Sequence, residues 1–307
     1  MNGFLNLLKP PGMTSHDVVD AVRKQLPGVK VGHGGTLDPG AAGVLPLLLG
    51  KVTKLAPYIL EYPKVYRTEL CLGISTDTAD SYGNITGRGH PPILGQGELE
   101  SFITSFIGEI EQIPPMYSAV KSKGRKLYEY ALKGQEVERL PRRVKIYYIN
   151  VISYFPPEKI MLEIKCSSGT YVRSLCEDIG KVIGCGGHMS FLVRTASGSF
   201  ELSETQSLEE LAGLARAGRA ETVLLPADFP FRGDKQLFLS EDLLKRLFNG
   251  TNLSLGQILQ VESAGLSDPV DGQIMAVYTT EGEFAALTRW KVVDNKFLLK
   301  LEKIWKQ

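Results

Sequence analysis

Residues 32–40 read GHGGTLDPG, and the expected fold depends on whether this stretch is a functional loop or the start of a helix. Its adjacent glycines let the backbone turn sharply or approach a ligand closely. Pro39 disfavours the helical region for Asp38 and holds the backbone of Asp38 extended. A carboxylate presented in this way on a loop can serve as a nucleophile or a base.

The same residues also suit a structural role. An Asp directly before a Pro is a favoured helix start, with Asp38 as the N-cap, Pro39 in the first turn and residues 41–49 continuing the helix. His33, beside its glycines, is typical of a loop histidine held by hydrogen bonds. From these residues alone the capping interpretation of Asp38 is favoured, and the catalytic one stays open.

The rest of the chain predicts a mixed fold. Thr14 is a predicted helix cap, because Asp17 follows three residues later. Alternating or apolar runs predict strands, and 3.6-residue periodicity predicts further helices. These elements interleave without a βαβ rhythm, which predicts an α+β fold with a largely antiparallel sheet. The predicted strands are 4–8, 65–72, 144–153 and 160–166, and the predicted helices are 99–107, 171–183 and 240–248.

Length and composition limit the class of protein. The 307 residues carry 35 Lys and Arg against 34 Asp and Glu, and 43% are hydrophobic. At about 150 residues per domain the chain suggests two domains, which we place at 1–233 and, as a small β-rich tail, at 234–307. No basic leader and no apolar run long enough to span a bilayer is evident. The four cysteines form no CxxC pair, so we expect reduced thiols in a cytoplasmic protein.

Two glycine-rich stretches resemble nucleotide-binding loops but lack their defining residues. Residues 43–51 have the wrong spacing for a phosphate-binding loop and no Ser or Thr after Lys51. Residues 184–189 lack the last glycine of a dinucleotide-binding motif. Metal-ligand spacing is also missing. The sequence therefore predicts neither a cofactor nor a metal.

The small net charge hides an uneven distribution. Residues 121–145 contain nine Lys or Arg and three Glu, a local charge of +6, with five tyrosines in or beside the segment. Cations interleaved with aromatic rings suit phosphate contact and base stacking, as in binding of single-stranded or looped RNA. A solvated cationic face is the alternative.

Seven motifs, in a fixed order over about two-thirds of the chain, match one known family. They are residues 9–15 (KPPGMTS), 32–39 (GHGGTLDP), 64–67 (KVYR), 73–80 (GISTDTAD), 113–121 (IPPMYSAVK), 169–173 (GTYVR) and 184–188 (GCGGH). Each motif alone is weak, but coincidence does not explain the ordered set. On these motifs the chain resembles the TruB family of tRNA pseudouridine synthases.

The resemblance implies a pseudouridine synthase fold and the isomerisation of uridine 55 in the T loop of tRNA. The glycosidic C–N bond breaks, the uracil turns and a C–C bond forms, without a cofactor. Asp38 matches the family's catalytic aspartate, which gives it a role beyond helix capping. Attack on the ribose C1′, attack on the base C6 and proton removal to a glycal all stay open.

Further site residues follow from the resemblance. Arg173 matches the arginine that pairs with the aspartate, and such a partner is expected to keep the pKa of Asp38 low. Tyr66 matches the tyrosine that stacks on the target uracil and is a candidate base for removal of the C5 proton in the last step. Tyr171 lines the same pocket. Leu192 aligns with an apolar residue that supports the base, although an ordinary core leucine is the alternative.

The expected RNA contacts also follow from the resemblance. His33 matches a histidine that enters the space left by everted T-loop bases. Lys9, Lys54 and Lys121 are expected substrate or pocket contacts. The segment at about 114–145 corresponds to an insertion that closes over the T arm. Asp77 and Asp80 are expected to organise a loop, and the tail at 234–307 resembles a PUA domain, a small RNA-binding module.

Two other functions remain in view. One is an RNA-binding or tRNA-folding protein without essential catalysis, against which the presence of Asp38, Tyr66 and Arg173 argues. The other is a guide-RNA-dependent relative of the dyskerin type, whose members carry extra sequence ahead of the motif that starts here at Lys9. The favoured expectation is a monomer that binds the tRNA T arm, with no membrane and no obligate protein partner.

Overall fold

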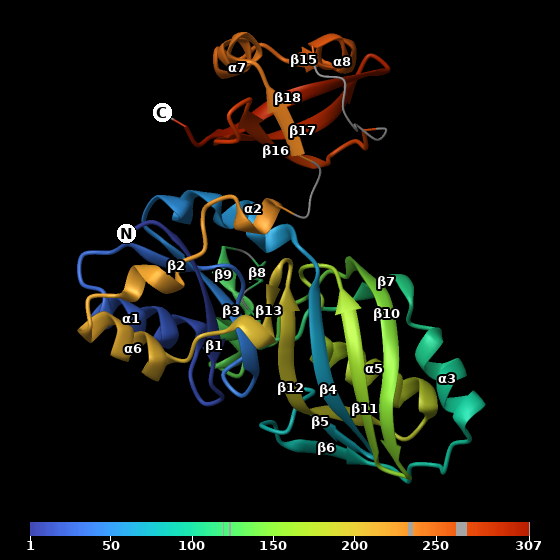
Figure 1. The fold of residues 1–307 in the computed structure, drawn as a ribbon. Coiled ribbons are helices and arrows are strands. Elements are labelled where there is room, and N and C mark those ends of the chain that lie inside the picture. Colours follow the sequence, from blue (N-terminus) through green and yellow to red (C-terminus); the bar gives the residue numbers. More distant parts are fainter. Residues whose placement is uncertain (119, 123, 233–235, 262–268, 307) are drawn as a thin grey trace. The chain divides into compact units, whose positions relative to one another are not determined.

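The computed structural model describes residues 1–307 apart from 119, 123, 233–235, 262–268 and 307 (Figure 1). The chain forms two compact units. The first comprises Met1 and Leu5–Leu224, and the second comprises Asn2–Phe4 and Leu225–Gln307. The main stretch of the second unit begins at Leu225, and the domain boundary between residues 233 and 234 stays a prediction.

The first unit is built on a sheet in which the strand order is β1-β3-β12-β4-β11-β10-β7, with β2 paired to β3 and β13 to β12. The pairs β12–β4, β4–β11, β11–β10 and β10–β7 are antiparallel, and β12–β3 is parallel. This confirms the predicted α+β fold with a largely antiparallel sheet. The strands are β1 (Gly3–Lys9), β2 (Val31–His33), β3 (Ala42–Leu49), β4 (Lys64–Leu72), β7 (Gly108–Gln112), β10 (Arg142–Phe155), β11 (Lys159–Cys166), β12 (Gly187–Ser197) and β13 (Phe200–Glu201).

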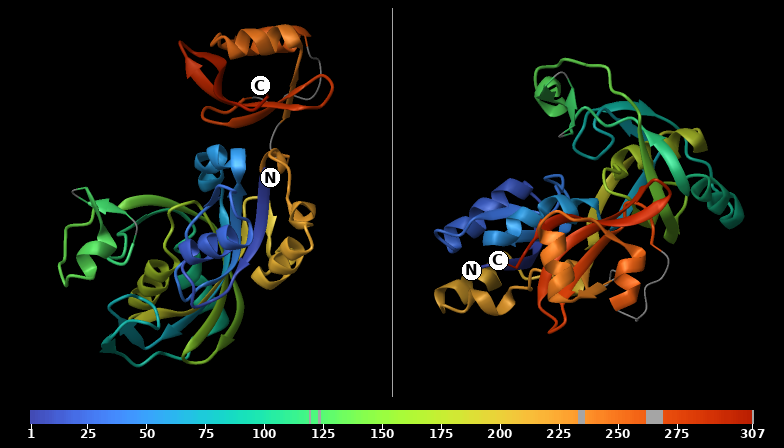
Figure 2. Two further views of the ribbon diagram at one scale, coloured as in Figure 1. Left: turned by 90° about the vertical axis from the view of Figure 1, so that its left-hand side faces the viewer. Right: turned by 90° about the horizontal axis from the view of Figure 1, so that it is seen from above.

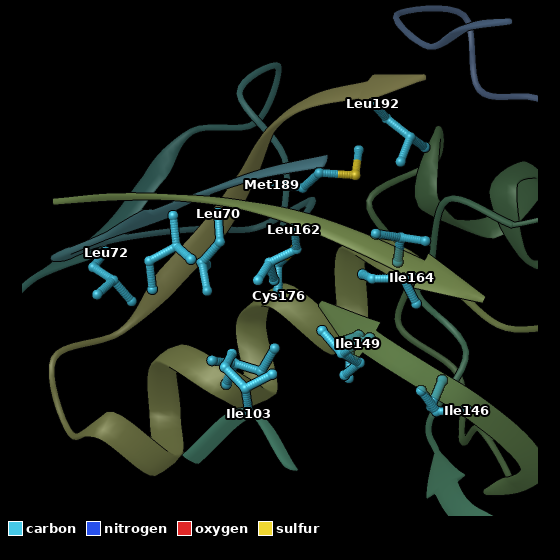
Figure 3. Close-up of a cluster of buried hydrophobic side chains, with 14 of the residues drawn as sticks. Leu70, Leu72, Ile103, Ile146, Ile149, Leu162, Ile164, Cys176, Met189 and Leu192 are labelled. Carbon is cyan, nitrogen blue, oxygen red and sulfur yellow. The ribbon is translucent and has the colours of Figure 1, made fainter. Parts of the chain in front are cut away.

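One hydrophobic cluster joins the middle of this sheet to the helices α5 (Val172–Ile183) and α3 (Gln96–Thr104). Every second residue of β11 is buried, because successive side chains of a strand point to opposite faces. Leu162 and Ile164 of β11 and Cys176 of α5 are fully buried in this cluster (Figure 3). Helix α5 ends at Ile183, and the next residue, Gly184, caps it with a φ of +90°, a left-handed conformation that glycine adopts without strain.

A second cluster packs helices α1 (Ser15–Gln25) and α6 (Leu208–Arg216) against strands β1 and β3. Thr14 caps α1 as predicted. Its Oγ1 accepts a 3.0 Å hydrogen bond from the Asp17 backbone N, and Asp17 Oδ2 accepts a 2.8 Å bond from the Thr14 N. This reciprocal box fixes where the helix begins.

The expectation of a helix at residues 41–49 is wrong, because Ala42–Leu49 form strand β3. Gly43 to Leu49 are all buried, so the run is continuously apolar instead of alternating. A fully buried strand of this kind cannot be distinguished from a helix by periodicity. Asp38 therefore does not cap a helix, and the capping interpretation is wrong.

The remaining elements of the first unit are short. Strands β5 and β6 pair with each other, as do β8 and β9 in the basic segment. They are β5 (Ile74–Thr76), β6 (Ile85–Arg88), β8 (Lys121–Ser122), β9 (Arg125–Lys126), α2 (Ala56–Glu61), α4 (Leu127–Ala131) and the 3₁₀ turns η1 (Gly50–Leu55), η2 (Leu202–Glu204) and η3 (Ala220–Val223).

The second unit contains a five-stranded sheet in the order β14-β16-β17-β18-β15, which fits the expected small β-rich tail. Trp290, Leu299 and Leu247 are buried in its core. Its elements are η4 (Phe229–Phe231), β14 (Gln236–Leu239), α7 (Glu241–Phe248), β15 (Leu253–Ser254), α8 (Leu255–Val261), β16 (Ile274–Thr279), β17 (Phe284–Val293) and β18 (Lys296–Ile304).

All four cysteines are free thiols, as expected, and three of them are buried. In the parts of the chain that the structure describes, no helix has the length and apolar character needed to cross a membrane.

Candidate active site

Asp38 lies on the loop that joins β2 to β3, and buried groups from β1 and α1 hold the main chain of this loop. Ser15 Oγ accepts a 2.9 Å hydrogen bond from the Leu37 N. Lys9 is 0% exposed, and its Nζ donates to the carbonyls of Ala41 at 2.7 Å and Pro39 at 3.2 Å. Burial lowers the pKa of Lys9 to about 8, against the opposing charge of Asp38. Lys9 thus holds the main chain of the loop, and its contact with substrate stays a prediction.

Arg194 of β12 holds the other end of the same loop, a role that the sequence reasoning missed. It is 1% exposed. Its Nε donates to the Val44 carbonyl at 2.7 Å, Nη2 to Gly35 O at 3.2 Å and Nη1 to Thr36 O at 3.4 Å. Among the described residues no carboxylate forms an ion pair with this guanidinium. The signal in the sequence is a cation two positions after Leu192 in a strand, which puts both side chains on one face.

Arg173 pairs with Asp38, as the resemblance implied. Its Nε lies 2.9 Å from Asp38 Oδ2, and its Nη2 lies 3.2 Å from Asp38 Oδ1. The guanidinium is buried in the first turn of α5 and also reaches two other segments. Nη2 donates to the Tyr117 carbonyl at 3.0 Å, and Nη1 lies 3.5 Å from Asp80 Oδ2. This two-point geometry fixes the direction in which the carboxylate points.

The electrostatics of Asp38 differ from the expectation. Burial, together with the nearby Asp80, raises the pKa of the Asp38 carboxyl above its ordinary value, although Arg173 acts to lower it. The expectation that Arg173 keeps this pKa low is therefore wrong in direction. The desolvation of a carboxylate in this environment outweighs the attraction of one guanidinium.

The loop at 77–84 supports Arg173 from the other side. Asp80 Oδ1 accepts hydrogen bonds from Thr78 Oγ1 at 2.6 Å and from the Tyr82 N at 3.0 Å. Asp77 Oδ1 accepts from the Asn84 N at 2.9 Å. Both aspartates thus organise the loop, as expected, and Asp80 in addition contacts Arg173. Ala79 holds φ +58°, an unfavourable value for a residue with a side chain that the surrounding bonds impose.

Tyr66 and Leu192 lie in the hydrophobic cluster next to the loop that carries Asp38. This cluster includes Leu37, the residue before Asp38, and Tyr66 is paired with Arg194 across strands β4 and β12. Burial raises the pKa of the Tyr66 phenol, and the charge of Arg194 opposes this shift. Tyr66 is therefore a neutral phenol at neutral pH. Leu192 is buried in the same cluster, which is the setting of a core leucine, and its contact with the substrate base stays a prediction.

The other predicted contact residues lie in different settings. His33 ends β2, and its Nδ1 accepts a hydrogen bond from the Gly35 N at 3.4 Å. Burial and the charge of Arg194 lower the pKa of His33, which favours the neutral ring. Tyr171 precedes α5, where its N donates to Gln112 Oε1 at 3.0 Å. Lys54 is exposed on η1, and the side chain of Lys121 lies outside the described part of the chain.

The basic segment leaves the sheet between β7 and β10 and returns to it after β8, β9 and α4 (Figure 2). Lys126 Nζ lies 5.5 Å from the ring centre of Tyr128, and Lys145 Nζ lies 5.6 Å from that of Tyr147. Such cation–aromatic pairs keep the cations on the surface beside rings that can stack. The segment reaches the site through Tyr117, whose carbonyl binds Arg173.

Within the described ranges, no group of three or more His, Cys, Asp or Glu residues is placed to hold a metal ion. Asp38, Arg173, Tyr66 and Arg194 instead form an arrangement of one carboxylate, two guanidinium groups and one phenol.

Residues 23–172 match the family described as TruB family pseudouridylate synthase (N terminal domain), and residues 173–232 match the tRNA pseudouridylate synthase B C-terminal domain. A protein of Alkaliphilus oremlandii named tRNA pseudouridine synthase B is 48% identical to this chain. The alignment covers 92% of this chain and 91% of that protein. A protein of the same name from Moorella thermoacetica is 40% identical and covers 99% of both chains.

Solved structures show the same architecture. A chain in the structure of an H/ACA RNP bound to a substrate RNA containing 2′-deoxyuridine is 26% identical, with a TM-score of 0.71 over 99% of this chain and 85% of that one. A chain of a Cbf5-Nop10-Gar1 complex is 28% identical, with a TM-score of 0.73 over 98% of this chain and 84% of that one.

Proposed function

The chain belongs to the TruB family of pseudouridine synthases, which are isomerases, and from this premise we propose that it converts uridine 55 in the T loop of tRNA to pseudouridine. The observation that carries the proposal is the Asp38 carboxylate, which is bound at both oxygens by the buried Arg173 and lies on a loop fixed at three points. In the reaction the bond from C1′ to N1 of uracil breaks and a bond from C1′ to C5 forms. C5 loses its proton to solvent and N1 gains one, so product and substrate have the same atoms and no oxidant or reductant is needed.

Asp38 is the proposed reactive group. In each possible mechanism its carboxylate must be ionised and must lie close to the ribose. Arg173 favours the ionised form and aims it, while partial burial raises the pKa of the carboxyl and so acts against that form; the Asp38 side chain stays 38% exposed and open to a substrate. A carboxylate held in one orientation reacts more readily than a freely rotating one, because the reacting geometry is already formed.

Tyr66 is proposed to stack on the target uracil, with Leu192 and Tyr171 beside it. Its raised pKa means that the phenol is neutral, which suits stacking but not proton abstraction. Use of Tyr66 as the base for C5 would depend on Arg194 to stabilise the phenolate.

Substrate RNA is proposed to be held by the basic segment and opened with the help of His33. The target uridine lies inside folded tRNA, so it must be turned out of its stack before Asp38 can reach it. The neutral, planar ring of His33 suits the vacated space. The cations and rings of the segment from about 114 to 145 suit phosphate contact and stacking.

Transfer RNA is favoured over a guide-RNA-dependent substrate. The relatives named tRNA pseudouridine synthase B share 40–48% of their residues with this chain over nearly its whole length. The chains of H/ACA-type complexes share 26–28%. We further propose that the catalytic part is 1–233, that 234–307 is a PUA-like RNA-binding part, and that a monomer acts without an obligate protein partner.

The test is release of tritium from tRNA labelled at uridine C5, followed by mapping of the modified position. The wild-type chain should release tritium from one position, uridine 55. Asp38→Asn should release none while keeping tRNA affinity within about tenfold, because the reacting group supplies little of the binding energy. The proposal is contradicted if uridine 55 stays unmodified, or if Asp38→Asn releases as much tritium as the wild-type chain.

A further inference from the structure

The side chain of Tyr82 has no part in the site described so far, and the residue is 77% exposed, the largest exposed fraction of any tyrosine in the described chain. An aromatic ring exposed beside a site proposed to bind RNA can stack on a base. The Tyr82 ring lies against Gly40 of the loop that carries Asp38, which makes it a candidate for such a contact.

The backbone that carries Tyr82 is fixed on both sides. The Tyr82 N donates to Asp80 Oδ1 at 3.0 Å, and the Ser81 N donates to the Met189 carbonyl at 3.1 Å. After the tyrosine, the Asn84 N donates to Asp77 Oδ1. The side chain has only two rotatable bonds, so a ligand that contacts it orders few additional groups.

The ring of Tyr82 lies against the loop that carries Asp38. Gly40 is two residues after Asp38, and a Cβ placed on Gly40 would overlap the Tyr82 ring edge and lie 2.5 Å from its hydroxyl. Asp80, two residues before Tyr82, and Asp38 both contact the guanidinium of Arg173. Arg173 thus joins the loop that carries the exposed ring to the loop that carries the reactive carboxylate.

We propose that Tyr82 stacks on one nucleobase of the substrate RNA that neighbours the target uridine, and so adds to the binding of the RNA beside Asp38. This inference rests on the proposed function. A stacking ring accepts any base, since every base has a π face, and it restricts the chain on one side of the turned-out nucleotide. Gly40 leaves space for the ring, so a side chain at position 40 would displace it.

The first test is steady-state kinetics on a T-arm RNA. Loss of one base stack weakens binding by about 5- to 150-fold, the equivalent of about 1–3 kcal/mol. Tyr82→Ala should therefore raise KM by that factor with kcat nearly unchanged, because the stack exists in ground and transition states alike. Tyr82→Phe should restore the wild-type KM. Phe155→Ala is the matched control, since Phe155 is 60% exposed at the far end of β10 and should have no effect.

The second test identifies the base. T-arm RNAs each carry one abasic nucleotide at a different position next to the target, and their dissociation constants are measured with wild type and Tyr82→Ala. At one position the abasic change should weaken wild-type binding as much as Tyr82→Ala does, and should weaken the variant no further. Such a non-additive pair marks direct contact.

The inference is overturned if Tyr82→Ala leaves KM and affinity unchanged, or if the two changes add at every position tested. Failure of the proposed function has a different signature. In that case the wild-type chain releases no tritium from tRNA, whatever residue stands at position 82.

Discussion

Arg173 binds both oxygens of the Asp38 carboxylate, with Nε 2.9 Å from Oδ2 and Nη2 3.2 Å from Oδ1. The two residues stand far apart in the sequence, on a loop and on a helix. A single ammonium group can neutralise the carboxylate but cannot fix its plane, whereas the planar guanidinium does both. Substitutions of Arg173 can therefore separate the effect of its charge on Asp38 from its effect on the orientation of the carboxylate.

The first prediction uses that separation. Arg173→Lys keeps the charge and loses the second bond, while Arg173→Gln loses both. Each should lower turnover by about 100-fold, because a small misplacement of the reacting group is this costly. Arg173 acts to lower the pKa of Asp38, so its removal in Arg173→Gln raises that pKa further. Activity needs the carboxylate and is lost as pH falls through its pKa, so the acid limb of turnover should move to higher pH in Arg173→Gln than in Arg173→Lys.

The pH profile of tritium release measures this shift. Arg67→Gln is the control, because Arg67 forms an exposed ion pair with Glu163 on the same sheet. Identical acid limbs in the two Arg173 variants would show that the charge of Arg173 does not influence the ionisation of Asp38.

The second prediction concerns Arg194, which binds three carbonyls and no carboxylate in the described part of the chain. Arg194→Met removes those bonds but also removes a buried charge, and the two effects oppose each other. The free energy of unfolding should therefore change by less than about 2 kcal/mol. Turnover should nevertheless fall by about 100-fold, since the Asp38 loop loses its support at Gly35 and Thr36.

Urea unfolding and single-turnover tritium release measure the two quantities on the same preparation. Lost stability with normal turnover in the folded fraction would make Arg194 a purely structural residue.

The third prediction concerns the basic segment. Reversal of Arg125, Lys126, Lys133 and Arg139 to Glu should weaken tRNA binding and flatten its salt dependence, because each lost phosphate contact lowers the log–log slope by about 0.7–0.9. Fluorescence anisotropy between low and high salt gives the slope. Reversal of the exposed Lys24 and Lys181, on α1 and α5, is the control. An equal slope for both variants would make the segment an ordinary solvated face.

The fourth prediction compares two glycines that flank the Asp38 loop. A Cβ on Gly43 would lie 2.7 Å from the Arg194 backbone N, and Gly43 holds φ +115°. A Cβ on Gly32 meets nothing closer than 4.0 Å. Gly43→Ala should cost more than about 2 kcal/mol of unfolding free energy, and Gly32→Ala should cost less than about 1 kcal/mol. Equal midpoints in urea would show that β12 can move away from β3.

Local features of the fold were predictable from the sequence. The Thr14–Asp17 box is complete within four residues, so its geometry depends on nothing distant. Strand β3 was not predictable in the same way. Its residues are buried on both faces by the sheet and its neighbours, and this removes the alternation that distinguishes a strand from a helix.

The site required more than local pattern. Resemblance to a family paired Asp38 with Arg173, although nothing in the spacing of the two residues predicts a contact. Arg194 escaped notice because its partners are main-chain carbonyls, which every residue has and which no motif reveals. The sign of the Asp38 pKa shift was missed for a related reason, since it depends on burial and on Asp80 as well as on the expected partner.

The three groups that hold the Asp38 loop come from β1, α1 and β12, which span most of the first unit. A growing chain contains Asp38 early, but Arg194 emerges from the ribosome more than 150 residues later. The contacts that orient Asp38 and hold its loop therefore cannot all form until residue 194 has been added to the chain. The order of the elements along the sequence makes the complete site a late product of synthesis.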